Sequence, residues 1–219
     1  MDNTKKIIIS LGTVGDSMVG KSSIVNRYLE KTFEDEYFST IGVNSGTKNI
    51  IMNINKKELP ITIKIWDTAG QEQFKSISVQ YIRNCFGMFI IYAINNKESF
   101  NNCISWLNEI EEKKCRDNTP IILIGNKIDL KDEREVSYEE GENFAKKYNL
   151  KFFECSAKEG INVNEAFKCI IDDVVELYKD EFIVDDKNDR DNKKIVPNPT
   201  KETAMNVKYS AHASGFWLS

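Results

Sequence analysis

Short apolar runs, rich in isoleucine, alternate along the chain with segments in which apolar residues recur every three or four positions. This alternation is typical of β-α units arranged around a mostly parallel sheet. The fourth and fifth of these runs are continuously apolar, so we expect central strands that are covered on both faces. The second and third runs are joined by the short polar link Asn55-Lys56-Lys57, which is typical of an antiparallel hairpin and makes the expected sheet mixed. The runs predict strands at residues 6–11, 43–53, 59–67, 87–94, 121–126 and 151–155.

Helical periodicity fills the segments between the predicted strands. Helices are expected at residues 21–31 and near Tyr81. A longer one is predicted at residues 98–114, with an apolar face made by Phe100, Ile104, Leu107 and Ile110. Ser137 and Glu140 match the capping-box pattern that begins a helix, here one that runs to Tyr148. Asn162 with Glu165 begins the last helix similarly, and its apolar face consists of Val163, Phe167, Ile170, Val174 and Leu177.

The length of 219 residues fits one well-buried domain with an extension, and we place the domain at residues 1–179. At residues 180–219, acidic and basic residues mix with Asn and Pro without periodicity, which predicts a flexible C-terminal tail. His212, the only histidine, lies in this tail and is not expected to be catalytic. The apolar end at residues 213–219 would suit a membrane or partner contact, but an unstructured terminus is the interpretation we favour.

The composition excludes several classes of protein. The net charge of -4 offers no basic surface, so we expect no binding to nucleic acid. The first six residues lack the apolar core of a signal peptide, and the run at 85–94 is far shorter than the roughly 20 apolar residues of a membrane-spanning helix. The cysteines contain no C-x-x-C pair and are interpreted as reduced cytosolic thiols: Cys85, Cys103, Cys115, Cys155 and Cys169.

A phosphate-binding loop is indicated directly after the first predicted strand. Backbone N–H groups in such a loop point at phosphate oxygens, aided by the dipole of the following helix, while Lys21 neutralises the outer phosphates. The hydroxyl of Ser22 suits Mg²⁺, which prefers oxygen ligands, and we include the adjacent Ser23 among the cofactor-binding residues. A glycine-containing turn that matches by chance is the alternative, and the strand-helix setting argues against it. The G-x-x-x-x-G-K-[ST] match consists of Gly15, Asp16, Ser17, Met18, Val19, Gly20, Lys21 and Ser22.

An N-K-x-D tetrad at the C-terminal end of the fifth predicted strand points to guanine. It contains Asn126, Lys127 and Asp129, and it lies where open α/β sheets form their ligand crevices. The Asp129 carboxylate is suited to accept hydrogen bonds from both N1–H and the 2-amino group of guanine. Adenine does not offer this pair of donors, so the contact that accepts guanine rejects adenine. Lys127 is expected to lay its alkyl stem along the base.

A third motif follows the sixth predicted strand. It consists of Ser156, Ala157 and Lys158, and we expect the Ala157 N–H to donate to the guanine carbonyl oxygen. Isolated N-K-x-D tetrads are common in turns, but a phosphate loop upstream and Ser-Ala-Lys downstream make a chance match remote. A phosphate-loop ATPase or kinase of another class is a remaining alternative, which competition between GTP and ATP would test.

Residues for hydrolysis are expected at the end of the third strand and in the loop before the second. Asp67 is placed to hold a water bound to Mg²⁺, and Thr40 supplies a second hydroxyl for the metal. Gly70 offers its N–H to the γ-phosphate, and the Gln71 amide orients the hydrolytic water. Phe33 is expected to stack on the base edge, although a lone aromatic in a loop often serves packing alone. A GTP-binding scaffold with negligible hydrolysis is the alternative function, and Gln71 argues against it.

With these motifs in this order, the chain resembles the small GTPases over about residues 6–178, and within them the Rab proteins. The resemblance implies a three-layer α/β P-loop GTPase fold, with a six-stranded mixed, mostly parallel sheet flanked by five helices. It also implies Mg²⁺-dependent hydrolysis of GTP to GDP, switch loops near residues 32–41 and 68–78, and a role in vesicle trafficking. The implied partners are effectors, exchange factors and GTPase-activating proteins. The Rab-like segments are residues 15–17, 41–43, 65–74, 81–83 and 91–95.

Between Ser22 and Tyr81 the only arginine is Arg27, in the helix after the phosphate loop. We therefore expect no arginine finger supplied by the chain itself. Intrinsic hydrolysis is predicted to be slow, on the order of 10⁻⁴ to 10⁻² per second, with a partner needed for fast turnover.

The chain departs from the usual Rab pattern at several positions. Asn44-Ser45 replaces the common Asp-Phe pair on the effector-facing edge, Gln73 replaces an arginine, and Met18 occupies a position that is often glycine. Rab chains typically end in prenylated cysteines, whereas the last cysteine here is Cys169, so membrane contact is left open. We expect a cytoplasmic monomer, with peripheral attachment to the cytosolic face of endomembranes as an open alternative.

Overall fold

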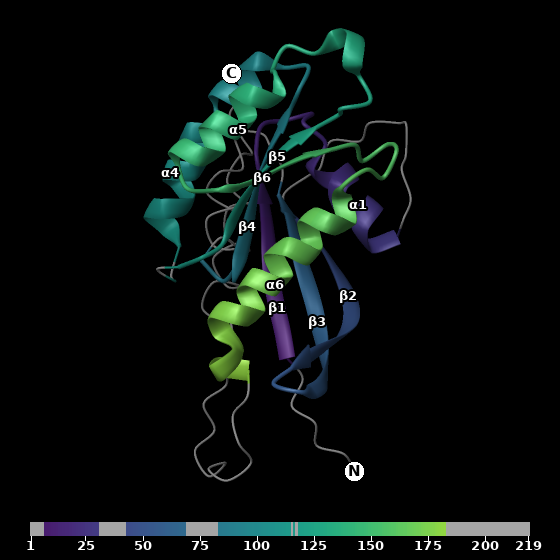
Figure 1. Ribbon diagram of the computed structural model, residues 1–219, viewed down its shortest axis with the longest axis vertical. Helices are drawn as coiled ribbons and strands as arrows, with labels where there is room; N and C mark the ends of the chain where they lie inside the picture. Colours follow the sequence, from purple (N-terminus) through teal and green to yellow (C-terminus); the bar gives the residue numbers. More distant parts are fainter. Residues whose placement is uncertain (1–6, 31–42, 69–82, 115, 117, 183–219) are drawn as a thin grey trace, which may run out of the picture. The chain divides into compact units, whose positions relative to one another are not determined.

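The computed structural model describes residues 7–30, 43–68, 83–114, 116 and 118–182. Its described strands form one six-stranded sheet in the order β2-β3-β1-β4-β5-β6 (Figure 1). β2 and β3 pair antiparallel, and the other neighbouring strands pair parallel. The predicted mixed, mostly parallel sheet is therefore confirmed. The strands are β1 (Ile7–Val14), β2 (Val43–Ile54), β3 (Lys57–Thr68), β4 (Gly87–Ala93), β5 (Ile121–Asn126) and β6 (Lys151–Cys155).

Helices cover both faces of this sheet. α1 and α6 pack on one face, where α6 crosses in front of the strands in Figure 1, and α3, α4 and α5 pack on the other. The three-layer α/β arrangement agrees with the prediction. The segment near Tyr81, where another helix was expected, lies outside the described residues. The described helices are α1 (Lys21–Glu30), α3 (Lys97–Asn101), α4 (Cys103–Lys113), α5 (Tyr138–Lys147) and α6 (Val163–Phe182), with the 3₁₀ turn η2 (Lys131–Glu133).

The two central strands are buried along their whole length, as their continuous apolar sequences predict. In β4, Phe89 and Ile91 enter the core beneath α1 and α6. The alternate residues Met88, Ile90 and Tyr92 enter the core beneath α3, α4 and α5. Successive side chains of a strand point to opposite faces, so this one strand supplies both cores.

The hairpin between β2 and β3 is tight. Ile54 pairs with Lys57, so only two residues form the loop. These are Asn55 and Lys56, whose φ angles are 51° and 65°. Positive φ at both loop residues is the signature of a type I′ turn, whose twist matches that of the flanking strands. The polar link predicted from the sequence is confirmed as an antiparallel hairpin.

The helix predicted at residues 98–114 is interrupted. α3 ends at Asn101 and α4 begins at Cys103, so the prediction of a single helix was wrong at Asn102. The backbone N–H of Asn102 still donates to the carbonyl of Glu98, and the Trp106 N–H donates to the Asn102 carbonyl. Helical hydrogen bonds therefore continue on both sides of Asn102, although the helix itself is interrupted there.

The starts of the last two helices follow the sequence in different ways. Ser137 and Glu140 form the predicted capping box of α5, with both of its reciprocal hydrogen bonds. α6 begins at Val163 after Asn162, as expected, but Asn162 has a φ of 57° and its amide donates to the Glu154 carbonyl. An N-cap residue usually has extended backbone, so this start differs from an ordinary cap. α6 continues to Phe182, which is buried.

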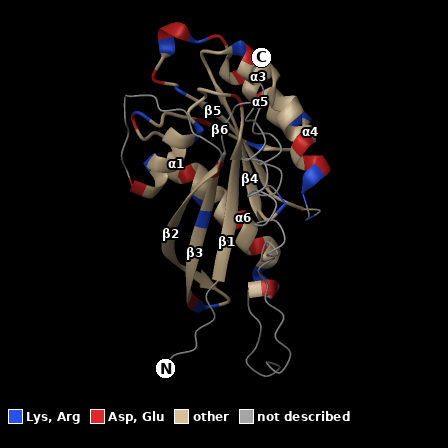
Figure 2. Cartoon of the chain, turned by 180° about the vertical axis from the view of Figure 1, so that it is seen from behind, with Lys and Arg blue, Asp and Glu red and all other residues tan. Residues whose placement is uncertain are grey.

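Charges of both signs interleave on the described helices and connecting loops, as Figure 2 shows. Lys151 pairs with Asp173, for example, and Arg134 pairs with Glu154. Among the described helices, none is long and apolar enough to cross a membrane.

Candidate functional site

The loops that follow β1, β5 and β6 meet at the carboxyl end of the sheet, because these strands run parallel. Asn126, the last residue of β5, joins them. Its Nδ2 donates to the Val19 carbonyl over 2.9 Å, and its Oδ1 accepts from the Ala157 N–H over 3.2 Å. Asn126 is 1% exposed, so these hydrogen bonds are shielded from water. The three sequence motifs therefore lie against one another in space.

The loop between β1 and α1 requires its two glycines. Gly15 has a φ of 144°, and a Cβ added there would lie 2.1 Å from the Ile91 carbonyl oxygen. Gly20 has a φ of 91°, and its added Cβ would lie 2.3 Å from Nδ2 of Asn126. The backbone thus packs directly against β4 and against the side chain that ties the loops together. A curved backbone of this kind presents successive N–H groups to an anion.

Lys21 lies at the start of α1 with its side chain buried. Its Nζ donates to the carbonyl oxygens of Gly15, over 3.0 Å, and Asp16, over 2.7 Å. Burial lowers the pKa of Lys21 to about 8, against the opposing charges of Asp67 and Asp16. A buried ammonium whose hydrogen bonds among the described residues go to carbonyls gains much from an anionic partner, and phosphate oxygens are such partners.

Asp67, near the end of β3, lies close to Lys21 and Ser22. Burial raises the pKa of its carboxyl group, while a hydrogen bond with Ser22 and the charge of Lys21 oppose that shift. Its Oδ1 is buried without a hydrogen-bond partner among the described residues. An orphaned carboxylate oxygen beside a serine hydroxyl fits Mg²⁺, which usually takes one or two carboxylates and keeps several waters. No cluster of three or more His, Cys, Asp or Glu side chains occurs in the described residues, and such a magnesium site needs none.

The region assigned to the base is held by Ser156. Its buried hydroxyl donates to Oδ1 of Asp129 over 2.6 Å and accepts from the Glu159 N–H over 3.0 Å. The carboxylate of Asp129 is thus fixed in orientation at a half-buried position. Lys127 has a φ of 70°, and burial lowers the pKa of its ammonium. The Ala157 N–H, predicted to bind guanine, already donates to Asn126, so a base would have to exchange or share that bond.

The Asp16 carboxylate connects the phosphate loop to residues at and near the start of α4. Its Oδ2 accepts from Nδ2 of Asn102 over 2.8 Å, and its Oδ1 accepts from Nε1 of Trp106 over 2.7 Å. Neither partner was singled out from the sequence, because they follow Asp16 by 86 and 90 residues. Among the other loop residues, Met18 has a φ of 64° and is 63% exposed, and Ser17 is also exposed.

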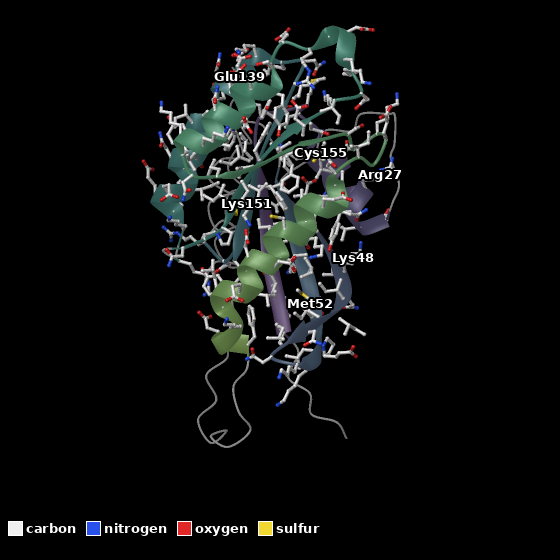
Figure 3. The ribbon with its side chains drawn as sticks, viewed as in Figure 1. Arg27, Lys48, Met52, Glu139, Lys151 and Cys155 are labelled. Atoms are coloured by element: carbon white, nitrogen blue, oxygen red, sulfur yellow. The ribbon has the colours of Figure 1, made fainter. Side chains whose placement is uncertain are left out.

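Arg27 on α1 is a second residue whose role the sequence did not reveal. Its Nε donates to the Ala157 carbonyl over 2.7 Å and its Nη2 donates to the Lys158 carbonyl over 2.6 Å. Figure 3 shows Arg27 beside the loop that follows Cys155. The guanidinium therefore holds the loop that contains Ser156 to α1. Two of its donors are thus bound to that loop.

Several predicted site residues lie outside the described residues: Phe33, Thr40, Gly70 and Gln71. Both predicted switch loops fall there as well, apart from Thr68 at the end of β3. A groove of about 490 Å³ lies elsewhere, at the amino ends of β5 and β6, between Pro120, Leu150 and Leu177. None of the predicted site residues lines it.

Known proteins resemble this chain over most of its length. The sequence pattern of the Ras family matches residues 8–176. The human Ras-related protein Rab-8B is 40% identical over 175 residues, which cover 80% of this chain and 82% of that protein. Rab-11C of Dictyostelium discoideum is 40% identical over 199 residues, 90% of this chain and 83% of its own. Rab-3 of Caenorhabditis elegans is 32% identical over 204 residues, with 93% and 91% covered.

Proposed function

Because this chain belongs to the Ras family and is a Rab-type small GTPase that hydrolyses GTP to GDP, we propose that the site at the carboxyl end of its sheet performs this reaction. We propose that residues 15–23 hold the phosphates, and that residues 126–129 and 156–158 hold the guanine. As a Rab-type switch, the protein acts in membrane trafficking. The observation that carries the proposal is the buried Asn126, which links the phosphate loop to the Ser156–Lys158 loop.

At the phosphate end, Lys21 provides the positive charge and the backbone N–H groups of residues 16–22 provide hydrogen-bond donors. The ammonium exchanges its two carbonyl partners, at least in part, for phosphate oxygens. The dipole of α1 adds to the attraction, because the helix begins at Lys21. The glycines at 15 and 20 let the loop pack against Ile91 of β4 and against Asn126, where a Cβ at either position would clash.

Ser22 and Asp67 are the described residues that would hold Mg²⁺, together with Thr40. When bound, the ion neutralises phosphate charge as it develops during hydrolysis. Asp67 would help to hold the ion through a water, from which its buried Oδ1, without a partner among the described residues, would accept a hydrogen bond. The hydrogen bond between Ser22 and Asp67 supports this assignment, because it holds both oxygens at the same point of the site.

At the guanine end, Asp129 selects the base. The Ser156 hydroxyl occupies one lone pair of its Oδ1 and fixes the plane of the carboxylate. The remaining acceptor capacity suits the two adjacent donors of guanine. An adenine would leave the carboxylate desolvated and unpaired, which is the physical basis of the rejection.

Hydrolysis itself we assign to Gln71, which orients the attacking water, with the Gly70 N–H on the γ-phosphate. Intrinsic turnover is then slow, on the order of 10⁻⁴ to 10⁻² per second, because the chain supplies no arginine to the transition state. Arg27 supports this view, since its guanidinium is already bound to the carbonyls of Ala157 and Lys158. A GTPase-activating partner supplies the missing charge, and effectors read the state of the switch loops.

Nucleotide competition tests the base assignment. We expect millimolar ATP to leave labelled GDP bound to the wild-type protein. Asp129→Asn should weaken GDP binding by about 100-fold or more, because a charged acceptor for two donors is lost. Asp132→Asn is the matched control, because Asp132 is an exposed carboxylate three residues further on, in η2. Effective competition by ATP, or equal GDP affinity in Asp129→Asn, would contradict the assignment.

Single-turnover hydrolysis tests the assigned chemistry. We expect the rate to fall when Mg²⁺ is removed and to fall again in Gln71→Leu. A rate that Gln71→Leu leaves unchanged would favour the scaffold alternative. A rate far above 10⁻² per second without any partner would show that the chain provides its own charge to the transition state.

A further inference from the structure

We infer that Asp16 is a positioning residue, whose carboxylate fixes the phosphate loop to the junction of α3 and α4 and so slows nucleotide release. The inference rests on the proposed function, because it concerns the same loop. It assigns a role to Asn102 and Trp106, which lie outside every motif of the site. The argument depends on where each polar atom of Asp16 is bound.

The two carboxylate oxygens of Asp16 are both used on the α4 side. Oδ1 accepts from the Trp106 indole N–H and Oδ2 accepts from the Asn102 amide, at 2.7 and 2.8 Å. The Trp106 side chain is 7% exposed and Asp16 is half-buried. Hydrogen bonds to an ionised acceptor at such partly buried positions are among the stronger polar contacts in proteins. These two bonds therefore fix the orientation of the Asp16 carboxylate.

The backbone of the same residue points the other way. The Asp16 carbonyl accepts from Nζ of Lys21 over 2.7 Å, and the Gly15 carbonyl accepts from the same ammonium over 3.0 Å. Asp16 thus connects Lys21 to α4, because its carbonyl binds Lys21 and its carboxylate binds Asn102 and Trp106. A fixed carboxylate sets the direction of this peptide, and with it the direction of the neighbouring N–H groups that face the phosphates. Donors fixed in advance lose less entropy on binding.

The break between the helices adds to this inference. Asn102 precedes α4, where asparagine is a favoured capping residue. Within the described part of the chain, however, its side chain makes no capping hydrogen bond to α4. The amide donates to Asp16 instead. Asn102 and Trp106 are four residues apart, so they lie on one face of the chain and reach the same carboxylate.

The release rate of labelled GDP from the full-length protein tests the inference. Trp106→Phe should speed release by about 10-fold, the effect of losing one charge-assisted hydrogen bond, and Asp16→Ala, which also loses the bond from Asn102, by about 10-fold or more. The double variant should release GDP at the rate of Asp16→Ala, and not about 10-fold faster again, because Asp16→Ala already breaks the contact that Trp106→Phe removes. Asn108→Ala, at an exposed position of α4, is the control and should release GDP at the wild-type rate.

A conservative variant separates positioning from general loosening. Asn at position 16 accepts from Trp106 and donates to Asn102 once the Asn102 amide flips, so Asp16→Asn should stay within about 3-fold of the wild type. The preference for GTP over ATP should be unchanged in Asp16→Ala, because the guanine end is untouched. Loss of that preference, or a lowered melting temperature that matches the faster release, would indicate a loosened fold and overturn the inference.

The possible failures are distinguishable. Should the wild-type protein not bind GDP, the proposed function fails. Should it bind GDP tightly while Asp16→Ala and Trp106→Phe release it at the wild-type rate, only the positioning role fails. Multiplied effects in the double variant would likewise overturn it, because the two residues would then act independently.

Discussion

At the scale of single residues, the site depends on backbone positions that only glycine tolerates and on side chains that bind carbonyls. Gly15 and Gly20 belong to the first kind, and Lys21, Asn126 and Arg27 belong to the second. The first kind is readable from a local motif. Of the second kind, Lys21 and Asn126 also belong to local motifs, but Arg27 does not, because it reaches a loop that follows it by 130 residues.

Gly15→Ala is expected to destabilise the fold by about 3 kcal/mol or more, because the new methyl group meets a backbone atom and the φ angle is unfavourable. Gly160→Ala is the matched control. Gly160 also has a positive φ, 75°, but the nearest atom to an added Cβ is 3.6 Å away. It should cost about 1–2 kcal/mol. Urea unfolding of both variants measures the difference, and equal losses would show that the contact with Ile91 is not tight.

At the scale of elements, local sequence signals decided where helices and hairpins begin. The capping box of α5 and the turn between β2 and β3 are both short-range patterns, and each formed where the sequence placed it. The interruption at Asn102 had no such signal. It coincides with a contact to Asp16, a residue on another element.

The contacts of Glu140 at the start of α5 predict that the stability of the fold depends on pH in the acidic range. The Glu140 carboxylate binds Lys97 and the Ser137 backbone, and these contacts lower its pKa from the ordinary 4.5 to about 2. A carboxyl group with a lowered pKa stabilises the fold fully above its unfolded value and loses that contribution as the pH falls through the folded value. The wild type should therefore lose stability faster than Glu140→Gln between about pH 4.5 and 2. Thermal unfolding at several pH values measures this, and parallel profiles would exclude the effect.

The turn between β2 and β3 predicts a stabilising substitution. Lys56 occupies a left-handed position that glycine adopts without a steric cost. Lys56→Gly should raise the free energy of unfolding by roughly 0.5–1 kcal/mol. This is a net value, because the relief of steric strain at residue 56 exceeds the entropic cost of ordering a glycine. Lys57→Gly, one residue later in β3, should lower the free energy of unfolding by roughly 0.5–1 kcal/mol. The same sign for both variants in urea unfolding would rule out the type I′ assignment.

At the scale of the whole molecule, two apolar cores on opposite faces of one sheet keep the site loops in place. Phe167 of α6 is fully buried, stacks on Tyr28 of α1 with ring centres 3.9 Å apart, and packs on Phe89 of β4. This aromatic group joins α6 and α1 to the centre of the sheet. The helix that begins at Lys21 therefore depends on a packing contact far along the chain.

Phe167→Ala should lower the free energy of unfolding by about 3–5 kcal/mol, the usual cost of removing a buried aromatic ring. Leu177→Ala on the same helix is the control, because Leu177 is 51% exposed, and should change it by about 0.5 kcal/mol or less. Urea denaturation curves give both values. A small loss in Phe167→Ala would mean that the core collapses around the vacated volume.

The sequence by itself determined the class of fold and the chemical identity of the site. Periodicity located the strands, because burial on one or two faces imposes a period of two residues or a continuous apolar run. The motifs predicted the phosphate loop and the base-binding residues. A loop that contacts phosphate needs glycine where the backbone is tightly curved and a positively charged side chain nearby, and both needs leave a pattern in the sequence. These are short-range requirements, so a linear pattern records them.

The tertiary structure alone decided which side chains support the site. The partners of the Asp16 carboxylate, the carbonyl contacts of Arg27 and the hydrogen bond from Asn126 to Val19 all join residues at least 86 positions apart. Such pairs form because the parallel strands bring their carboxyl ends to one edge, and no local pattern marks a side chain for a distant carbonyl. The sequence therefore predicted the residues that we propose as nucleotide contacts, and the packing of the sheet determined what holds the described ones in place.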